Sequence, residues 1–241
     1  MPGNCYPGGL DLHLCGDKNS VDLPVLDDIN ANVSTYSSFR HRLSWGTRTM
    51  GICGRQPEGG EMARVRYVPT AELAETQAAL NERLQKERKV PTGNIFLALA
   101  NAPAILNDFL TYANAVRAAD LSPKLREMAI LTVGYCTNSE YEIVHHHSHG
   151  LKAGLTEDQL KAIPEFETSD LFSEEEKAVM AFAKDSTLNV NVSDEVWSGI
   201  AKFLSEKQLV ELAINVAWYN SGVRLMGALK VDLEDSYKKS A

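Results

Sequence analysis

The chain has 241 residues, of which 44% are apolar, enough to bury a sizeable core in one or two domains. Its formal net charge of −8 argues against nucleic acid and anionic membrane surfaces as partners. No apolar run reaches the roughly 18 residues that a membrane-spanning helix needs, so we expect no membrane segment. The cysteines Cys5, Cys15, Cys53 and Cys136 have no C-x-x-C spacing, which predicts no disulfide framework and a cytoplasmic location.

Residues 1–61 differ in composition from the remainder of the chain. They are rich in Gly, Pro, Asn and Ser and show neither a helical nor a strand period. This composition predicts a poorly ordered or accessory extension, followed by a helical domain over residues 62–241. His13 and His41 fall in the extension, so we do not expect them in a catalytic site.

The helical domain begins with three predicted helices. The segment from Ala71 to Arg88 is rich in helix-forming residues and predicts one helix with its leucines on one face. The segment from Asn94 to Ala102 is apolar all round, which predicts a short buried helix. Pro103 is placed to open the next helix. The apolar stripe of that helix consists of Ile105, Phe109, Tyr112, Ala113 and Val116.

Capping signals divide the rest of the chain into further helices. Ser122-Pro123 predicts the start of one helix. Capping boxes at Thr156–Gln159 and Ser173–Glu176 predict two more, and Ser193 is placed to cap a short one. A last long helix is expected over residues 205–229. No segment alternates as a strand does, so the predicted fold class is all-α.

A short internal repeat supports a helical fold. Glu127-Met-Ala-Ile130 and Tyr135 match Glu211-Leu-Ala-Ile214 and Tyr219 at one constant offset along the chain. The match predicts two related helical units, of which the first carries the histidines and the second completes the core. Glu211 is then the structural counterpart of Glu127.

The stretch from Leu125 to Leu155 contains four of the six histidines and is the strongest candidate for a functional site. It predicts two consecutive helices that break near Thr137–Ser139, with Gly154 as the stop signal. The break is short enough to form an αα-hairpin, which would bring the two helices side by side.

Several ionisable residues of this stretch fall on facing sides of the hairpin. Glu142, His146 and His149 follow an i, i+4, i+7 spacing, which puts them on one helix face together with His145. Glu127, on the preceding helix, can reach that face across the hairpin. The spacing therefore predicts a site that combines carboxylates with imidazoles.

These residues resemble the carboxymuconolactone decarboxylase-like family, which includes the alkylhydroperoxidase D (AhpD) proteins. The resemblance covers roughly residues 62–235 and depends on Glu127, Ser139, Glu142-x-x-x-His146 and Ala153-Gly154-Leu155. Members of the thiol-peroxidase branch have cysteines at the positions of Ser139 and Glu142, and both are absent here. The decarboxylase-like branch carries an E-Y-E-x-x-x-H pattern, which Glu140-Tyr141-Glu142 and His146 reproduce.

The resemblance implies an AhpD-like helical bundle and a decarboxylase-like lyase without an organic cofactor. It also implies a homo-oligomer, a trimer or hexamer, that acts on a small molecule. In the resembled decarboxylase, a carboxylated lactone loses carbon dioxide and the dienolate is protonated.

The chemistry of the residues points in the same direction. Imidazole changes charge between about pH 5 and 8, so His146 is a candidate general acid and base. Glu142 can set the tautomer of His146 or, if desolvated, carry a proton itself. We therefore expect Glu127, Glu142 and His146 to be catalytic, on a small unsaturated lactone or keto acid. Ser139 and His149 are the expected substrate-binding residues.

Other residues are assigned by their position in the predicted helices. Tyr141 and His147 neighbour the site in sequence, but their helical positions point them elsewhere, and His147 is expected at the surface or an interface. The candidate pocket-wall residues are Phe96, Phe109, Tyr112, Tyr219 and Asn220.

Four other interpretations stay open. Glu142 and His146 could form an ordinary i, i+4 helix pair. His145 and His149, with their neighbours, could bind Zn²⁺ or a similar ion, although no H-E-x-x-H motif occurs. A thiol peroxidase needs two thiols within disulfide reach, and Cys136 stands alone in this region. The last alternative is a non-catalytic, oligomeric binding protein.

Overall fold

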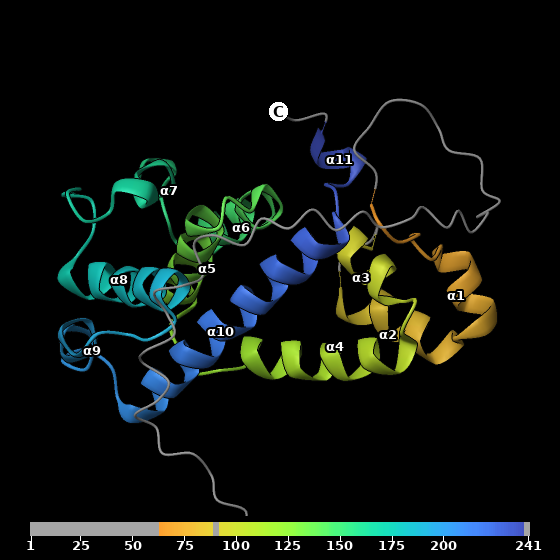
Figure 1. The fold of residues 1–241 in the computed structure, drawn as a ribbon, viewed down its shortest axis with the longest axis horizontal. Coiled ribbons are helices and arrows are strands. Elements are labelled where there is room, and N and C mark those ends of the chain that lie inside the picture. The colour runs from red at the N-terminus through yellow and green to blue at the C-terminus, as the bar shows by residue number, and fades with distance from the viewer. Residues whose placement is uncertain (1–62, 89–91, 239–241) are drawn as a thin grey trace, which may run out of the picture. The chain divides into compact units, whose positions relative to one another are not determined.

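The computed structural model describes residues 63–88 and 92–238, and the extension predicted at residues 1–61 lies outside this part of the chain. The described residues form eleven α-helices and one 3₁₀ helix and contain no strand, so the all-α prediction is confirmed (Figure 1). The elements are α1 (Thr70–Thr76), α2 (Ala78–Glu87), α3 (Asn94–Leu99), α4 (Pro103–Arg117), α5 (Pro123–Cys136), α6 (Glu140–Lys152), α7 (Glu157–Ala162), η3 (Ile163–Glu165), α8 (Glu174–Asn189), α9 (Asp194–Ile200), α10 (Glu206–Leu229) and α11 (Asp235–Lys238). None of these helices is long and apolar enough to cross a membrane.

Helix α5 lies at the centre of this domain. It packs against α6, α8 and α10, and the long helix α10 crosses the middle of Figure 1. All residues from 127 to 134 are buried, because α5 is covered by several helices and most of its side chains in this run are apolar. Glu127 is the one charged residue in this buried run. The two segments of the internal repeat lie on α5 and α10, which are in contact with each other.

The predicted helix from Ala71 to Arg88 is wrong in one respect, because it is two helices. Gln77 has φ −143° and ψ 54°, which ends α1 and redirects the chain into α2. This turn allows the leucines of both helices to enter a second hydrophobic cluster. The buried members of that cluster are Val68, Leu73, Leu80, Leu84, Ala100, Leu106 and Leu110.

Helix α4 is rotated relative to the predicted stripe. Its buried residues are Leu106, Leu110, Ala113 and Val116, whereas Ile105 is 66% and Tyr112 45% exposed. The two leucines, four residues apart, enter the second cluster and set this rotation.

Helix α3 is less buried than predicted. It ends at Leu99, and Ala98 is its one fully buried residue. The difference arises because Ile95 and Phe96 line a cavity instead of a closed core.

The connection between α5 and α6 fixes the hairpin that carries the predicted site. Asn138 adopts a left-handed conformation with φ 52°, which asparagine tolerates better than most residues. The Ser139 amide donates to the Gly134 carbonyl at 2.9 Å, and the Asn138 amide donates to the Tyr135 carbonyl at 3.2 Å. These two bonds form a Schellman motif, so the predicted break at Thr137–Ser139 is confirmed.

Close packing of the two helices depends on Gly134. A Cβ atom at this position would lie 3.1 Å from Ile143 Cγ1 and 3.4 Å from Glu142 Cβ. The absence of a side chain therefore allows α6 to approach α5 closely enough for their polar groups to meet.

The predicted capping boxes at Thr156 and Ser173 are present at the starts of α7 and α8. Ser205 forms a third one at the start of α10. Gly154, with φ 96°, follows the end of α6 as predicted.

Candidate active site

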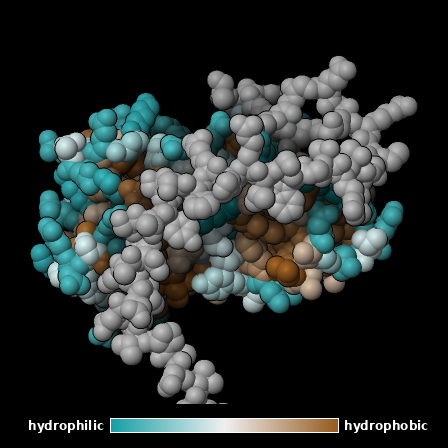
Figure 2. All heavy atoms as spheres, in the orientation of Figure 1, coloured by the Kyte–Doolittle hydropathy of each residue, from teal (hydrophilic) through white to brown (hydrophobic). Residues whose placement is uncertain are grey.

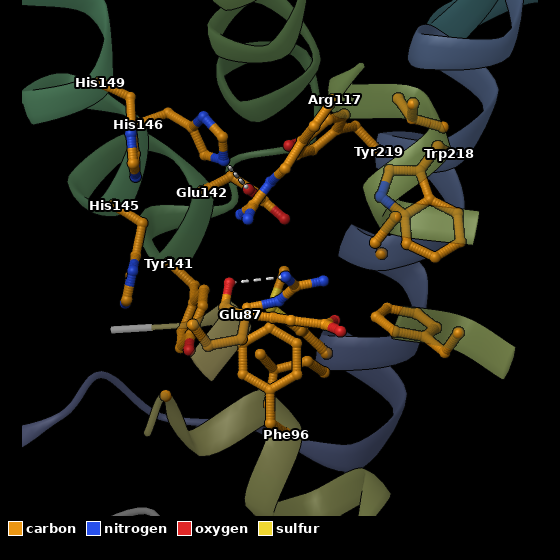
Figure 3. Close-up of a pocket in the computed structure, with 18 of the residues that line it drawn as sticks. Glu87, Phe96, Arg117, Tyr141, Glu142, His145, His146, His149, Trp218 and Tyr219 are labelled. Carbon is orange, nitrogen blue, oxygen red and sulfur yellow. Dashed lines mark hydrogen bonds and ion pairs between the residues drawn. The ribbon is translucent and has the colours of Figure 1, made fainter. Parts of the chain in front are cut away.

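A cavity of about 680 Å³ opens between α2, α3, α4, α6, α10 and the segment before α11. In Figure 3, His145, His146 and His149 approach the cavity from one side, and Trp218 and Tyr219 from the other. Phe96 lies opposite Glu142 in the same view. The cavity is thus bounded by imidazoles and a carboxylate at one side and by aromatic rings elsewhere.

His146 is held between two carboxylates. Its Nδ1 lies 2.7 Å from Glu127 Oε2 on α5, and its Nε2 lies 3.3 Å from Glu142 Oε2, one turn earlier on α6. Glu127 and Glu142 are each 7% exposed, so the pair of contacts is shielded from solvent. The structure therefore brings together all three predicted catalytic residues, with Glu142 and His146 lining the cavity and Glu127 behind them.

The pKa values of the two carboxyl groups are shifted in opposite directions. Burial raises the pKa of Glu142 above its ordinary value, and the positive charges of His146 and His145 only partly offset this. Burial also opposes ionisation of Glu127, but the hydrogen bond and the charge of His146 outweigh it and lower the pKa of Glu127. Two acids with different environments on one imidazole are suited to different roles, a proton donor and a fixed anion.

This arrangement can store one proton in two ways. In the first, Glu142 is protonated and donates to Nε2 of neutral His146, whose Nδ1–H donates to the Glu127 carboxylate. In the second, the proton has moved to Nε2, and an imidazolium lies between two carboxylates. Both forms have the same net charge, so the proton can pass between Glu142 and His146 without exchange with water.

Tyr219 covers the imidazole from α10. Its ring lies edge-on to the His146 ring, with 5.0 Å between centroids. Burial and the nearby charges of Glu142 and Glu127 raise the pKa of its hydroxyl, so Tyr219 stays protonated. The second repeat unit thus supplies part of the site as well as part of the core.

Glu234 forms a second polar cluster at the cavity wall. Its Oε1 accepts hydrogen bonds from the Tyr141 hydroxyl at 2.7 Å and from the backbone N–H of Asn94 at 2.6 Å. Its Oε2 lies 2.7 Å from His145 Nε2. Although burial opposes ionisation, these bonds lower the pKa of Glu234 to about 2. Tyr237 packs on the other side of His145, with 4.4 Å between ring centroids.

Tyr141 therefore departs from the sequence-based expectation. We expected it to point away from the site, but its ring lines the cavity and stacks on His145 at 4.3 Å. Its hydroxyl is bonded to Glu234 and not to Glu142 or His146, because the side chain turns toward the segment before α11.

The remaining predicted residues are divided between the cavity and other places. His149 lines the cavity, 5.3 Å from His146 between ring centroids. Ser139 is the N-cap residue of α6 and lines a different hollow, so the structure does not bring it to Glu127, Glu142 and His146. His147 is at the surface as expected and lies 3.1 Å from Glu157.

Of the five expected wall residues, Phe96, Phe109 and Tyr219 line the cavity. Tyr112 is largely exposed, and the Asn220 amide donates to Thr187 Oγ1 at 2.9 Å, away from the cavity. Arg88, Asn215, Gly222 and Glu234 also line the cavity and escaped the sequence analysis. The position of Asn215, four residues before Tyr219 on one helix face, is the only signal that could have found it.

The described part of the chain contains no group of three or more His, Cys, Asp or Glu side chains arranged to hold a metal ion. His145 and His149, the weaker alternative, have different surroundings: His145 contacts Glu234, and His149 lies beside His146. Cys136 is partly buried at the end of α5, and burial raises the pKa of its thiol.

Residues 103–185 match the model of the Carboxymuconolactone decarboxylase family, and this segment contains Glu127, Glu142 and His146. No curated protein gives a significant match to the sequence. The matched segment also contains the residues on which the sequence resemblance to this family depends.

Solved structures share the fold at low sequence identity. A variant of the debrominase Bmp8 in complex with 2,3,4-tribromopyrrole has a TM-score of 0.64 and 18% identity, over 76% of this chain and 97% of its own. An uncharacterized peroxidase-related protein from Ralstonia eutropha JMP134, with an alkylhydroperoxidase AhpD core, has a TM-score of 0.63 and 17% identity, over 74% of this chain and 96% of its own. An uncharacterized peroxidase-related protein from Silicibacter sp. TM1040 has a TM-score of 0.62 and 17% identity, over 76% of this chain and 97% of its own. These likenesses confirm the AhpD-like fold.

Proposed function

We propose that this protein is a decarboxylase-like enzyme that uses general acid–base chemistry on a small unsaturated lactone or keto acid. The observation that carries the proposal is the placement of His146 between Glu127 and Glu142, with Glu142 at the cavity wall. A buried carboxyl group with a raised pKa is suited to donate a proton, and the fixed anion behind the imidazole keeps the ring placed to pass a new proton to it.

The proposed reaction is a loss of carbon dioxide followed by protonation of carbon. The bond between the substrate carbon and its carboxylate breaks, carbon dioxide leaves, and the electron pair remains in the conjugated enolate. The Glu142 proton then moves to that carbon. Glu142 recovers a proton through His146 from water, so each turnover consumes one proton. Glu127 remains ionised and holds the imidazole in place.

A turnover screen tests this proposal. Unsaturated lactone carboxylates and keto acids are incubated with the full chain at several pH values, and carbon dioxide release is measured. A substrate found in this way should lose turnover by roughly 10²–10⁴ in Glu142→Gln and in His146→Ala, the usual scale of acid–base catalysis. Retention of wild-type turnover in both variants would show that these residues are an ordinary helix pair.

The same screen distinguishes the alternatives. A metal-dependent enzyme would lose activity with EDTA and regain it with Zn²⁺. A thiol peroxidase would turn over a hydroperoxide and depend on Cys136, which is the single cysteine among residues 63–88 and 92–238. A non-catalytic binding protein would turn over none of the compounds, whichever variant is used.

A further inference from the structure

Two polar side chains in the cavity have buried atoms without hydrogen-bond partners in the described structure. They are Arg88, through Nε and Nη2, and Asn215, through both Nδ2 and Oδ1. Both residues line the cavity that contains Glu142 and His146. An unpartnered buried polar group costs roughly 1–3 kcal/mol, so folded proteins rarely leave four such atoms around one cavity unless something binds there.

The guanidinium of Arg88 is fixed by contacts on one edge only. Its Nη1 donates to the Glu87 carbonyl and to Asn114 Oδ1, each at 2.8 Å. Asn114 is fixed in turn by donating to Glu87 Oε2 at 2.7 Å. The Phe96 ring lies 5.3 Å from the Arg88 Cζ atom and supports the guanidinium plane. These contacts orient Arg88 before any ligand arrives.

The unpartnered atoms of Arg88 form the opposite edge. In a guanidinium group, Nε–H and the neighbouring Nη2–H are parallel and match the two oxygens of a carboxylate. Burial and the charge of Arg117 lower the pKa of Arg88 to about 10, which leaves the group cationic at neutral pH. The free edge is therefore a preorganised donor pair for a planar anion.

Asn215 supplies the second element of the site. Its side chain is only 1% exposed, and α10 places it one turn before Tyr219, which contacts His146. An amide offers both a donor and an acceptor, and neither is used within the described residues. Such a group suits a hydroxyl, a carbonyl or a second carboxylate oxygen of a bound molecule.

The charges and rings around the cavity favour the same kind of ligand. Arg117 and Arg126 line it together with Arg88, whereas the carboxylates of Glu87 and Glu234 are already bonded to neighbouring protein groups. Phe109 and Trp218, 4.4 Å apart between centroids, add an aromatic wall. A cationic cavity with aromatic walls fits a small planar organic acid.

We propose that Arg88 and Asn215 form an anion-binding subsite, in which Arg88 holds a carboxylate of a planar organic acid and Asn215 bonds to a polar oxygen of the same molecule. This inference rests on the proposed function, because it names the part of the substrate that is held while Glu142 acts elsewhere on it. It assigns the carboxylate at Arg88 to binding and not to reaction.

Binding of acids that do not react tests the subsite separately from catalysis. Isothermal titration calorimetry on the full chain at neutral pH compares 2-furoate and benzoate, each with its uncharged amide. We expect at least one acid to bind at least about tenfold more tightly than its amide, since charged hydrogen bonds are roughly twice as strong as neutral ones. Arg88→Met should remove this preference, and Arg88→Lys should restore it only in part because lysine lacks the paired donors.

Arg224→Met is the matched control. Arg224 is exposed on α10 and donates to the Asn220 carbonyl at 2.9 Å, so its loss removes one positive charge outside the cavity. The control should bind the acids as wild type does. Circular dichroism of each variant confirms that the fold is retained.

Asn215→Leu distinguishes a binding role from a structural role, because the two roles predict opposite changes in melting temperature. Leucine has a similar size and removes both unpartnered atoms, so the melting temperature should rise while acid binding weakens by about tenfold. A structural asparagine would instead lower the melting temperature on substitution.

Two results would overturn the subsite. One is that neither acid binds more tightly than its amide to the wild-type chain, including the absence of any binding. The other is that Asn215→Leu lowers the melting temperature and leaves affinity unchanged, which would identify buried water as the partner of the amide. Failure of the acid–base proposal would be seen in a different measurement, the turnover assay, as activity that survives Glu142→Gln.

Discussion

Glu142 and Gly222 lie next to each other in the wall of the cavity. Glu142 Oε1 lies 3.5 Å from the position that a Cβ atom on Gly222 would occupy. Glu142 Oε2 is directed to His146, so Oε1 is the oxygen available to a bound molecule. Because Gly222 has no side chain, the space beside Oε1 stays open to a bound molecule.

Gly222→Ala should therefore reduce activity without weakening the fold. The added methyl group would occupy the space beside Oε1 at ordinary contact distance, and we expect kcat/KM to fall by about tenfold or more, on the scale of a misplaced substrate. Alanine in a helix should add about 0.5–1 kcal/mol of stability. Gly227→Ala is the matched control on the same helix, because a Cβ atom there meets nothing within 4 Å. Equal activity of the two variants would contradict this account.

The residues of the proton relay should act as a unit. Glu127→Gln should reduce turnover because glutamine cannot hold the His146 imidazole as a buried anion does. The double variant Glu142→Gln/His146→Ala should cost little more than the worse single variant, since groups that act together are non-additive. Glu211→Gln is the control from the repeat, because Glu211 accepts a hydrogen bond from the Leu121 backbone N–H at 2.9 Å and does not line the cavity. Steady-state kinetics should show wild-type turnover, within a few-fold, with a lowered melting temperature for this variant.

Because the pKa of Glu142 is raised, both activity and stability should fall as the pH rises. As a proton donor, Glu142 should lose activity as the pH rises through its folded-state pKa, which gives kcat/KM an alkaline limb. The folded chain binds this proton more tightly than the unfolded chain, so stability falls as the pH rises above the ordinary value of 4.5. Glu142→Gln cannot lose a proton. The melting temperature of this variant should exceed that of wild type, and calorimetry should show the difference growing as the pH rises from 4.5 toward the folded-state pKa of Glu142.

Glu234 should show the reverse dependence. Its folded-state pKa of about 2 lies below the ordinary 4.5, so its contribution to stability is present above pH 4.5 and is lost as the pH falls toward 2. Glu234→Gln should lower the melting temperature at neutral pH by about 2–4 °C, the expected result of losing roughly one net hydrogen bond in a domain of this size. This difference should vanish near pH 2. Glu82→Gln, on the exposed side of α2, should leave the melting curve unchanged at every pH.

We also expect self-association through exposed apolar residues. Figure 2 shows hydrophobic residues gathered in the region of α3 and α4, and Ile105 is 66% exposed there. Light scattering at micromolar concentration should report a homo-oligomer, and Ile105→Glu should weaken it because association would bury the charge. Leu171→Glu, at a residue 50% exposed before α8, is the comparison. A monomeric wild-type chain would rule out this expectation.

The helices and the contact between Glu142 and His146 were predictable because their determinants are local. Capping boxes, the break before Ser139 and the spacing of Glu142 and His146 depend on residues within one or two turns. The rotation of α4 and the division of Ala71–Arg88 were not predictable in this way. Both depend on which leucines enter a cluster shared by several helices, and no single helix contains that information.

Several residues of the cavity wall could not be predicted from the sequence. Glu234 meets Asn94 across a separation of 140 residues, and Arg88 and Asn215 come from opposite ends of the domain. Neither forms a motif with its neighbours in sequence. Tyr141 was misplaced for the same reason, because its orientation is set by Glu234 and not by its own helix.

The tight α5–α6 hairpin also has a consequence for folding. The contact between Glu127 and His146 spans 19 residues, whereas the contacts of Glu234 with Asn94 and Tyr141 span 140 and 93. Contacts between residues close in sequence form sooner on average, because less chain entropy is lost when the loop closes. We therefore expect the carboxylate–imidazole pair to assemble early and the enclosing wall late, so that the folding chain acquires its chemical groups before it acquires the pocket that selects their substrate.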